Sequence, residues 1–443
     1  MRLDVLSGPG NLRKTQVAFG LPPLIMGRRL TPKMNAILTT CPSRSSRLTR
    51  ASASQVKAER VESVVPTASS RSSSSATLRA DVLEGDAPLY QPPTGYASDH
   101  ENDRVYFNTY DDTEKLKKSE IYCCDFRTKR WKNITKSIHH LPPPLGSPRR
   151  KEQLPSRYGA GMAFYKSTIH RQHMLLLYGG QTDGLATAPG AVSNELIAVD
   201  VDNTKWWVVH VAGGKAVPRV QSRLVVSGDT FCIFGGKTFV GGAFQPINSF
   251  CVATFRDMEW RWDVLDEPYP SHIPPLGWCC PATVVDRGRK ILLNVGCTDR
   301  EDEVDVSADT IVLFNITERV FEAQPRPGGN FPGTVSYYHL ASFDEDGRLP
   351  TSSVVFCAFY VRPGEPRYEL ELYVYSYAPE KGGSMSTDEG WCKSLEKRRP
   401  LAAVEQNLEV FVVVRSRMYL IGYGENSQRY KVFVESLGSG CVV

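Results

Sequence analysis

The sequence contains no long run of hydrophobic residues. Its longest uninterrupted apolar stretch, VVFCAFYV from Val354 to Val361, has eight residues. A helix that crosses a bilayer needs about 20 such residues. We therefore expect no transmembrane helix and no membrane partner.

Several motifs that would indicate chemistry are also missing. The sequence has no G-x-x-x-x-G-K-[ST] phosphate loop, no G-x-S-x-G nucleophile turn and no C-x-x-C pair. Its 11 cysteines are scattered, and the adjacent pairs Cys123–Cys124 and Cys279–Cys280 would point to opposite faces of a strand. This pattern favours free thiols in a reducing compartment, so we expect a cytoplasmic protein.

The basic excess of the chain is confined to its beginning. Residues 1–80 hold 13 Lys and Arg against 3 Asp and Glu, whereas the remainder holds 40 basic and 45 acidic residues. A mildly acidic body argues against a nucleic-acid partner. Residues 1–75 are rich in Ser and Arg and have few bulky apolar residues, which predicts a disordered tail before a folded domain at 76–443. The alternative is an organelle presequence, and in that case the protein would be mitochondrial.

From Tyr90 onward, short apolar stretches alternate with Gly, Pro, Asn and Asp, and no segment keeps a helical period. This pattern predicts an all-β chain. Similar stretches recur at intervals of 56 to 70 residues, and six units of this kind indicate a repeat architecture. The stretches are VYFNTY, LLLYGG, FCIFGG, ILLNVG, FCAFY and YLIGYG, which end at Tyr110, Gly180, Gly236, Gly296, Tyr360 and Gly424.

A second landmark follows each of the first four stretches. A polar residue precedes a large aromatic residue by 12 positions, in the pairs Ser119 and Trp131, Asn194 and Trp206, Asn248 and Trp260, and Asp309 and Phe321. Each segment reads as a strand, a turn rich in Asp, Asn, Thr or Lys, and a second strand. We expect the aromatic ring to fill the wedge between neighbouring sheets.

A hydrophobic strand that ends in Gly-Gly, followed by these Asn, Asp and Trp spacings, resembles the kelch repeat. Asn194, Asp200 and Trp206 match it most fully. The resemblance, to the galactose oxidase and kelch superfamily, implies a six-bladed β-propeller. Residues 429–437 read as a third strand of the last blade, so we expect a strand within residues 75–85 to complete that blade and close the ring.

The pair Gly179–Gly180 then reads as the end of an inner strand, where a side chain would block the neighbouring backbone or the turn. It leads into a loop broken by Gly and Pro and not into a helix, so a phosphate cradle is disfavoured.

Two arginines are the candidate binding residues. Arg157 and Arg219 each begin a unit, where the resemblance implies polar side chains near the mouth of the channel. They would meet acidic residues of a partner or form structural ion pairs, and both interpretations stay open.

The histidines do not form a convincing metal site. Resemblance to galactose oxidase would imply copper held by His and Tyr, but no histidine follows His339. His170 and His173 are expected in an exposed turn that enters a strand, and His139–His140 in a loop. We therefore expect no metal and no cofactor.

These observations favour a non-catalytic, monomeric propeller that binds other proteins through its loops. The segments QTDGLATAPGAVS (181–193) and KTFVGGAFQPI (237–247) are the expected contact surfaces. One alternative is an oxidase, isomerase or lyase built on the same fold. Another is a ubiquitin-ligase adaptor, although residues 1–75 show no amphipathic helix for an F-box.

Overall fold

In the computed structural model the chain divides into two units, Met1–Ser72 and Ser73–Val443. The tail expected at 1–75 lies outside the described residues. The structure describes residues 79–81, 83–88, 93–111, 118–141, 153–167, 172–182, 191–273, 282–294, 310–325, 337–343, 353–361, 368–377, 391–394, 406–414, 417–424 and 427–436.

The described strands form sheets that follow the order of the chain, with two short 3-10 turns, η1 (Thr135–Ser137) and η2 (Asp286–Gly288). The first sheet contains β2 (Glu84–Gly85), β3 (Pro93–Asp99), β4 (Arg104–Asp111), β5 (Lys118–Asp125) and β6 (Arg130–Asn133). The second contains β7 (His139–His140), β8 (Gly161–Lys166), β9 (His173–Tyr178), β10 (Leu196–Asp200) and β11 (Lys205–Val209). The third contains β12 (Val211–Ala212), β13 (Arg223–Ser227), β14 (Thr230–Phe234), β17 (Ser249–Arg256) and β18 (Glu259–Pro268).

The remaining described sheets have four strands or two. The fourth contains β19 (Ala282–Val285), β20 (Lys290–Asn294), β21 (Thr310–Asn315) and β22 (Val320–Pro325). The fifth contains β23 (Tyr337–Phe343), β24 (Ser353–Val361), β25 (Tyr368–Tyr377) and β26 (Trp391–Ser394). The sixth contains β27 (Gln406–Val414), β28 (Arg417–Gly424), β29 (Ser427–Ser436) and β1 (Arg79–Asp81). A separate hairpin pairs β15 (Lys237–Val240) with β16 (Ala243–Pro246).

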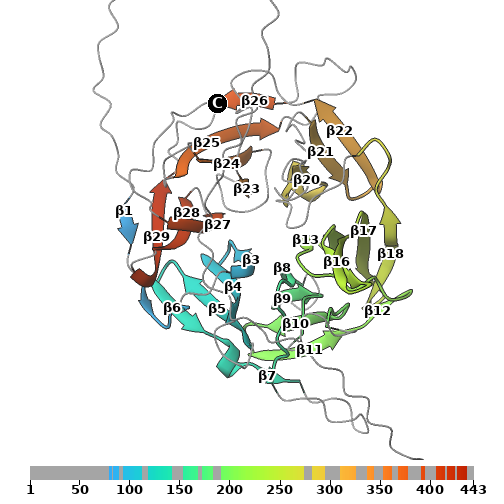
Figure 1. Cartoon of the computed structure of the whole chain (residues 1–443), viewed down its shortest axis with the longest axis horizontal. Helices are drawn as coiled ribbons and strands as arrows, with labels where there is room; N and C mark the ends of the chain where they lie inside the picture. Colours follow the sequence, from blue (N-terminus) through green and yellow to red (C-terminus); the bar gives the residue numbers. More distant parts are fainter. Residues whose placement is uncertain are drawn as a thin grey trace, which may run out of the picture. The chain divides into compact units, whose positions relative to one another are not determined.

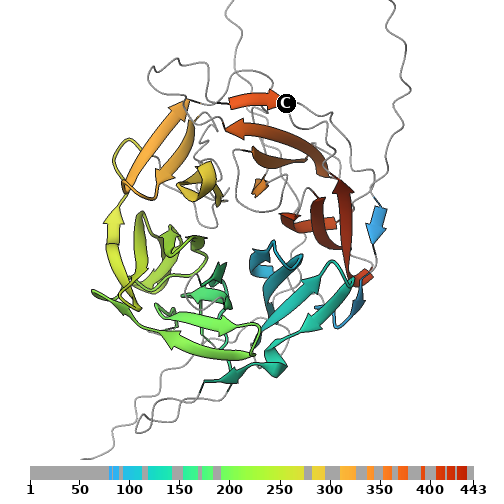
Figure 2. The ribbon, with the colours of Figure 1, turned by 180° about the vertical axis from the view of Figure 1, so that it is seen from behind.

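The sheets of Ser73–Val443 follow one another around a ring. Contacts between their first long strands run through β3, β8, β13, β19, β23 and β27 and return from β27 to β3. These strands lie toward the centre of the ring, and β11, β18, β22 and β29 lie toward its outside (Figure 1). The view from behind shows the same ring (Figure 2). The predicted all-β chain and its propeller arrangement are confirmed.

The two ends of the ring are joined within one sheet. Strand β1 pairs antiparallel with β29, and Arg79 lies opposite Val434. The strand order β1-β29-β28-β27 makes β29 the third strand and β1 the outermost one. The predicted completion of the last sheet by the earlier segment is confirmed.

The recurring hydrophobic stretches are the second long strands of their sheets, β4, β9, β14, β20, β24 and β28. The aromatic residues that follow the first four stretches, Trp131, Trp206, Trp260 and Phe321, are buried. Each belongs to a cluster that also contains residues of the preceding sheet: Tyr419 with Trp131, Ile121 with Trp206, Leu176 with Trp260, and Phe250 with Phe321. The expected filling of the wedge between sheets is therefore confirmed.

The turns before Trp131, Trp206 and Phe321 share one hydrogen-bonding pattern. The side-chain Oδ1 atoms of Asp125, Asp200 and Asn315 each accept hydrogen bonds from the backbone N–H groups two and three residues later. Four positions after each of them the backbone has a positive φ, at Lys129, Thr204 and Arg319. A side-chain acceptor of this kind stabilises the tight reversal, as the Asp, Asn and Thr content predicts.

Short parallel strands cover the outer edges of three sheets. β2 pairs with β6 at Trp131, β7 with β11 at Trp206, and β12 with β18 at Trp260. The expectation that His139–His140 is a loop was wrong, because these residues form β7. The pairing uses backbone groups of the connecting segment, which no side-chain pattern reveals. It also protects edge strands that would otherwise expose unpaired backbone groups.

Gly179–Gly180 closes a strand against the next sheet. Gly179 has φ +70°, and a Cβ added to it would lie 2.2 Å from the backbone oxygen of Arg219. The N–H of Gly180 donates to that same oxygen at 2.7 Å. The glycines therefore permit a direct backbone contact between the second sheet and the segment that enters the third, as their position in the strand predicts.

Candidate functional site

One face of the second and third sheets gathers most of the residues predicted to be functional. Neighbouring long strands are antiparallel, so successive connections alternate between the two ends of the strands. The segments entering the first long strands and the connections from second to third strand share one end. We call this end the hairpin face, which comprises residues 156–160, 179–182, 191–195, 216–222 and 235–248.

A β-hairpin, β15–β16, projects from this face. The sequence predicts a loop at 237–247, whereas most of this segment forms two paired strands around Gly241 and Gly242. Val240 and Phe244 are 59% and 36% exposed. Phe239 lies opposite Phe244, with ring centroids 5.3 Å apart in an edge-to-face arrangement. The hairpin therefore presents an ordered apolar tip to solvent.

The base of the hairpin is held by backbone hydrogen bonds. Lys237 and Val220 exchange two N–H···O bonds of 2.8 Å, and the N–H of Ile247 donates to the oxygen of Gly236 at 2.8 Å. Lys237 is also the only charged residue between positions 237 and 246. The tip thus projects from a fixed base, and its surface is nearly uncharged. The other expected contact segment, 181–193, is described only at 181–182 and 191–193.

Arg219 lies beneath this face and is fully buried. Its Nη1 donates to the backbone oxygens of Gly235 and Ser249 at 3.0 and 2.9 Å. Its Nη2 contacts the Asp266 carboxylate at 2.5 Å. These bonds tie the entry of the third sheet to its second, third and fourth long strands, which is the ion-pair role that the sequence left open.

Arg157 occupies the corresponding position in the second sheet and is also buried. Its Nη2 lies 2.5 Å from the carboxylate of Glu195, whose side chain is 41% exposed. The backbone oxygen of Arg157 accepts a hydrogen bond from Nδ2 of the buried Asn108 at 2.7 Å, which links the first and second sheets. A partner-binding role for Arg157 and Arg219 stays a prediction.

The described histidines and acids form no group suited to a metal ion. Among the described residues, no group of three or more His, Cys, Asp or Glu side chains is arranged to hold a metal ion. His173 was expected in an exposed turn, but it is the half-buried first residue of strand β9, and its ring nitrogens face Asp202 at 3.1 Å and Glu101 at 3.7 Å. His170 lies outside the described residues. No helix among the described residues is long and apolar enough to cross a membrane.

Four cysteines, Cys123, Cys124, Cys232 and Cys251, are free and buried. Burial raises the pKa of Cys232 and Cys251 to about 12, although Arg319 and Arg219, respectively, act in the opposite direction. The pKa of Cys124 is also raised by burial, well above its usual value. These thiols are therefore protonated at neutral pH and are poor nucleophiles.

No protein-family model and no curated protein matches the sequence. The candidate site therefore depends on geometry: an apolar hairpin over a network of buried arginines. The sequence identified the hairpin segment and both arginines. It did not reveal that the hairpin is exposed while the arginines are enclosed, since both facts depend on packing between strands.

Proposed function

We propose that residues 76–443 form a six-bladed propeller of the kelch type that binds another protein through the hairpin face. Support for the blade number comes from the sheets that pair in chain order and from the closed sequence of contacts among their first strands. Support for the kelch type comes from the second sheet, which has Gly179–Gly180, Asp200 and Trp206. Gly-Gly recurs in the third sheet, the Asp turn in the first, and the buried Trp in both.

The exposed β15–β16 tip is the observation that carries the binding proposal. Val240 and Phe244 place apolar surface in solvent at no evident gain to the fold, and such surface marks interaction sites when it is ordered and clustered. Aromatic side chains are also enriched among the residues that dominate binding energy. The partner we propose is a protein with an apolar cleft that receives this tip.

We also propose that the propeller binds as a monomer. β1, β2, β7 and β12 cover the outer strands of four sheets, so these edges offer no free strand to a second copy. A rigid ring with one projecting element suits recognition without catalysis, because the loops vary without disturbing the core.

The proposal is tested by affinity capture from the native cell with the wild-type chain and with Val240→Ser and Phe244→Ser variants. We expect a reproducible partner to be lost or reduced about tenfold with either variant, since each removes an apolar side chain that the complex would bury. Val320→Ser is the matched control, because Val320 is 45% exposed at the opposite end of the fourth sheet. Retention of the same partners by both hairpin variants would refute the role of the tip.

A further inference from the structure

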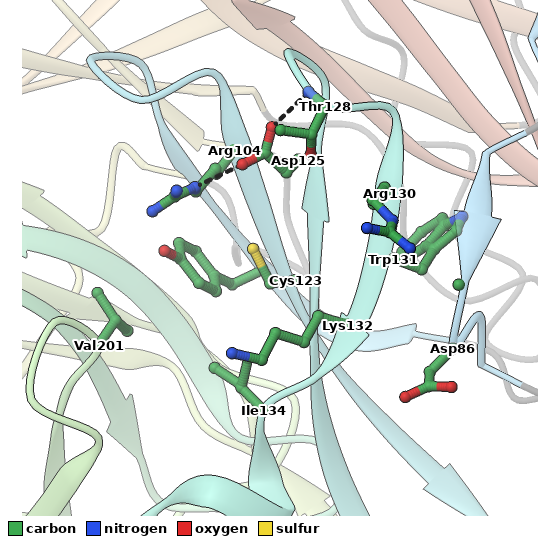
Figure 3. Close-up of a pocket in the computed structure, with 12 residues that line it drawn as sticks. Asp86, Arg104, Cys123, Asp125, Thr128, Arg130, Trp131, Lys132, Ile134 and Val201 are labelled. Atoms are coloured by element: carbon green, nitrogen blue, oxygen red, sulfur yellow. Dashed lines mark hydrogen bonds and ion pairs between the residues drawn. The ribbon is translucent and has the colours of Figure 1, made fainter.

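A pocket of about 460 Å³ opens on the outer part of the first sheet, at the end of the strands opposite the hairpin face (Figure 3). This volume lies in the range of sites for small organic ligands. Its main wall carries two rows of side chains that cross β4, β5 and β6, and the second sheet contributes one residue from the turn after β10. The rows are Arg104, Asp125 and Arg130, and Tyr106, Cys123 and Lys132; Ile134 and Val201 complete this side.

Strand register assembles this wall. Asp125 pairs directly with Arg104 on one side and with Arg130 on the other. Cys123, two residues earlier, pairs in the same way with Tyr106 and Lys132. Residues two apart on a strand share a face, so all six side chains point to the same side of the sheet.

The carboxylate in this wall is already fully engaged. Asp125 Oδ2 accepts a hydrogen bond from Arg104 Nε at 3.0 Å, and Oδ1 accepts from the N–H groups of Arg127 and Thr128 at 3.0 and 2.9 Å. Burial raises the pKa of Asp125, but these bonds from Thr128 and Arg104 outweigh it and lower the pKa overall. Asp125 is therefore ionised and neutralises Arg104.

Arg130 and Lys132 keep their charges. Both are exposed, and within the described chain no carboxylate lies within ion-pair distance of either one. Figure 3 shows Lys132 extended toward Ile134 and Val201, whereas the Asp86 carboxylate, which also lines the pocket, lies on the other side of the strand. The lining thus carries three cations, Arg104, Arg130 and Lys132, and two carboxylates, Asp125 and Asp86, which leaves a net positive charge.

This charge pattern is specific to the first sheet. The residue after the buried tryptophan is Lys132 there, Trp207 in the second sheet and Arg261 in the third. Arg261 forms an ion pair with the carboxylate of Glu259, which compensates its positive charge. The unpaired cations are therefore not a general requirement of the repeat.

The floor beneath the cations is neutral. Tyr106 and Ile134 are buried, and Val201 is half-buried. Burial raises the pKa of Cys123 to about 12, against the influence of Arg104, so its thiol is uncharged at neutral pH. An apolar floor next to two cations suits a ligand with an anionic group and an apolar body.

We propose that this pocket binds a small phosphate monoester, with its phosphate paired to Arg130 and Lys132 and its apolar or aromatic body against Ile134 and Val201. A phosphate monoester carries a charge of about −1.5 to −2 at neutral pH and three acceptor oxygens, so it can pair with both exposed cations, whereas a single carboxylate carries one charge. Both cations form strong charge-assisted hydrogen bonds with phosphate oxygens. This site is separate from the hairpin face and does not rest on the protein-binding proposal.

The test is a calorimetric titration of the full chain with phenyl phosphate, inorganic phosphate and phenol at low salt. We expect phenyl phosphate to bind best, inorganic phosphate more weakly and phenol not measurably. Lys132→Met and Arg130→Met should each weaken phenyl phosphate binding about tenfold, since each removes one charge-assisted contact. Lys132→Arg should retain binding, because it keeps the charge.

Lys205→Met is the matched control. Lys205 stands opposite Asp200 in the second sheet as Arg130 stands opposite Asp125 in the first, and it is exposed. This variant should bind phenyl phosphate like the wild type. The proposal is overturned if phenyl phosphate fails to bind, or if it binds equally well to Lys132→Met and Arg130→Met. Binding no tighter than that of inorganic phosphate would overturn the apolar part of the site.

Discussion

Nη2 of Arg219 and Oδ1 of Asp266 lie 2.5 Å apart, and the Arg219 side chain has no exposed surface. The guanidinium arises from the segment that enters the third sheet, and the carboxylate belongs to the outermost long strand of that sheet. The pair therefore connects the inside of the sheet to its outside. Its enclosure makes it a sensitive point for stability.

Replacing this arginine should destabilise the ring strongly. Arg219→Met removes the cationic partner of the Asp266 carboxylate and one donor from each of two backbone oxygens, and breaking a buried pair in this way costs about 3–5 kcal/mol. Denaturant unfolding followed by circular dichroism measures the loss. Arg261→Met is the control, because Arg261 and Glu259 form an exposed pair that contributes at most about 1 kcal/mol. Equal stability of the two variants would contradict the role given to Arg219.

Alanine substitutions at two glycines distinguish a steric from a conformational loss in the free energy of unfolding. Gly241 has φ +62° and open space around an added Cβ, so Gly241→Ala should cost only the conformational penalty of about 1–2 kcal/mol. Gly179 has a similar φ of +70°, but an added Cβ would clash with the Arg219 oxygen. Gly179→Ala should therefore cost about 1–3 kcal/mol more. Thermal unfolding of both variants measures the difference, and equal losses would show that the backbone contact gives way freely.

Closure of the ring depends on strand β1. Deleting residues 76–86 removes β1, which exposes the edge of β29, and also removes β2, which covers β6. We expect the melting temperature to fall by at least about 5 °C, and we expect some self-association through the open edge. Deleting residues 1–70 is the control and should leave both properties unchanged. Unchanged melting of the 76–86 deletion would show that β1 does not stabilise the ring.

Stability should fall in alkaline solution. The pKa of the buried Cys232 and Cys251 thiols is about 12 in the folded chain, against an ordinary value of 9.0. Between these values the unfolded chain releases the thiol proton and the folded chain retains it. The free energy of unfolding therefore decreases by about 1.4 kcal/mol per pH unit for each such thiol. Cys232→Ala should make this decline shallower, and an unchanged slope in pH-dependent denaturation would contradict the assignment.

The repeat could be predicted from the sequence because the patterns that indicate it are local. Hydrophobic stretches such as LLLYGG mark the second strand of each sheet, and the 12-residue spacing to Trp206 and its counterparts marks the outer hairpin. Asp200 stabilises its turn through atoms two and three residues away. Such contacts depend on the nearby sequence alone.

The pocket shows why other features could not be predicted from the sequence. Arg104, Cys123 and Lys132 come from three strands, and only the register between those strands brings them to one wall. A shift of one residue would send each side chain to the opposite face. The parallel pairing of His139–His140 with β11 is equally invisible in sequence, because it uses backbone groups.

The sequence by itself determined the all-β character, the spacing of the units and the positions of the glycines and large rings. These properties follow from periodicity and turn chemistry along one chain. Only the tertiary structure decided which groups are enclosed and which are exposed: Arg219 lies inside, the β15–β16 tip lies outside, and Arg130 and Lys132 have no carboxylate partner in the described chain. The reason is physical, since exposure and charge pairing depend on neighbours that register and packing bring from distant segments.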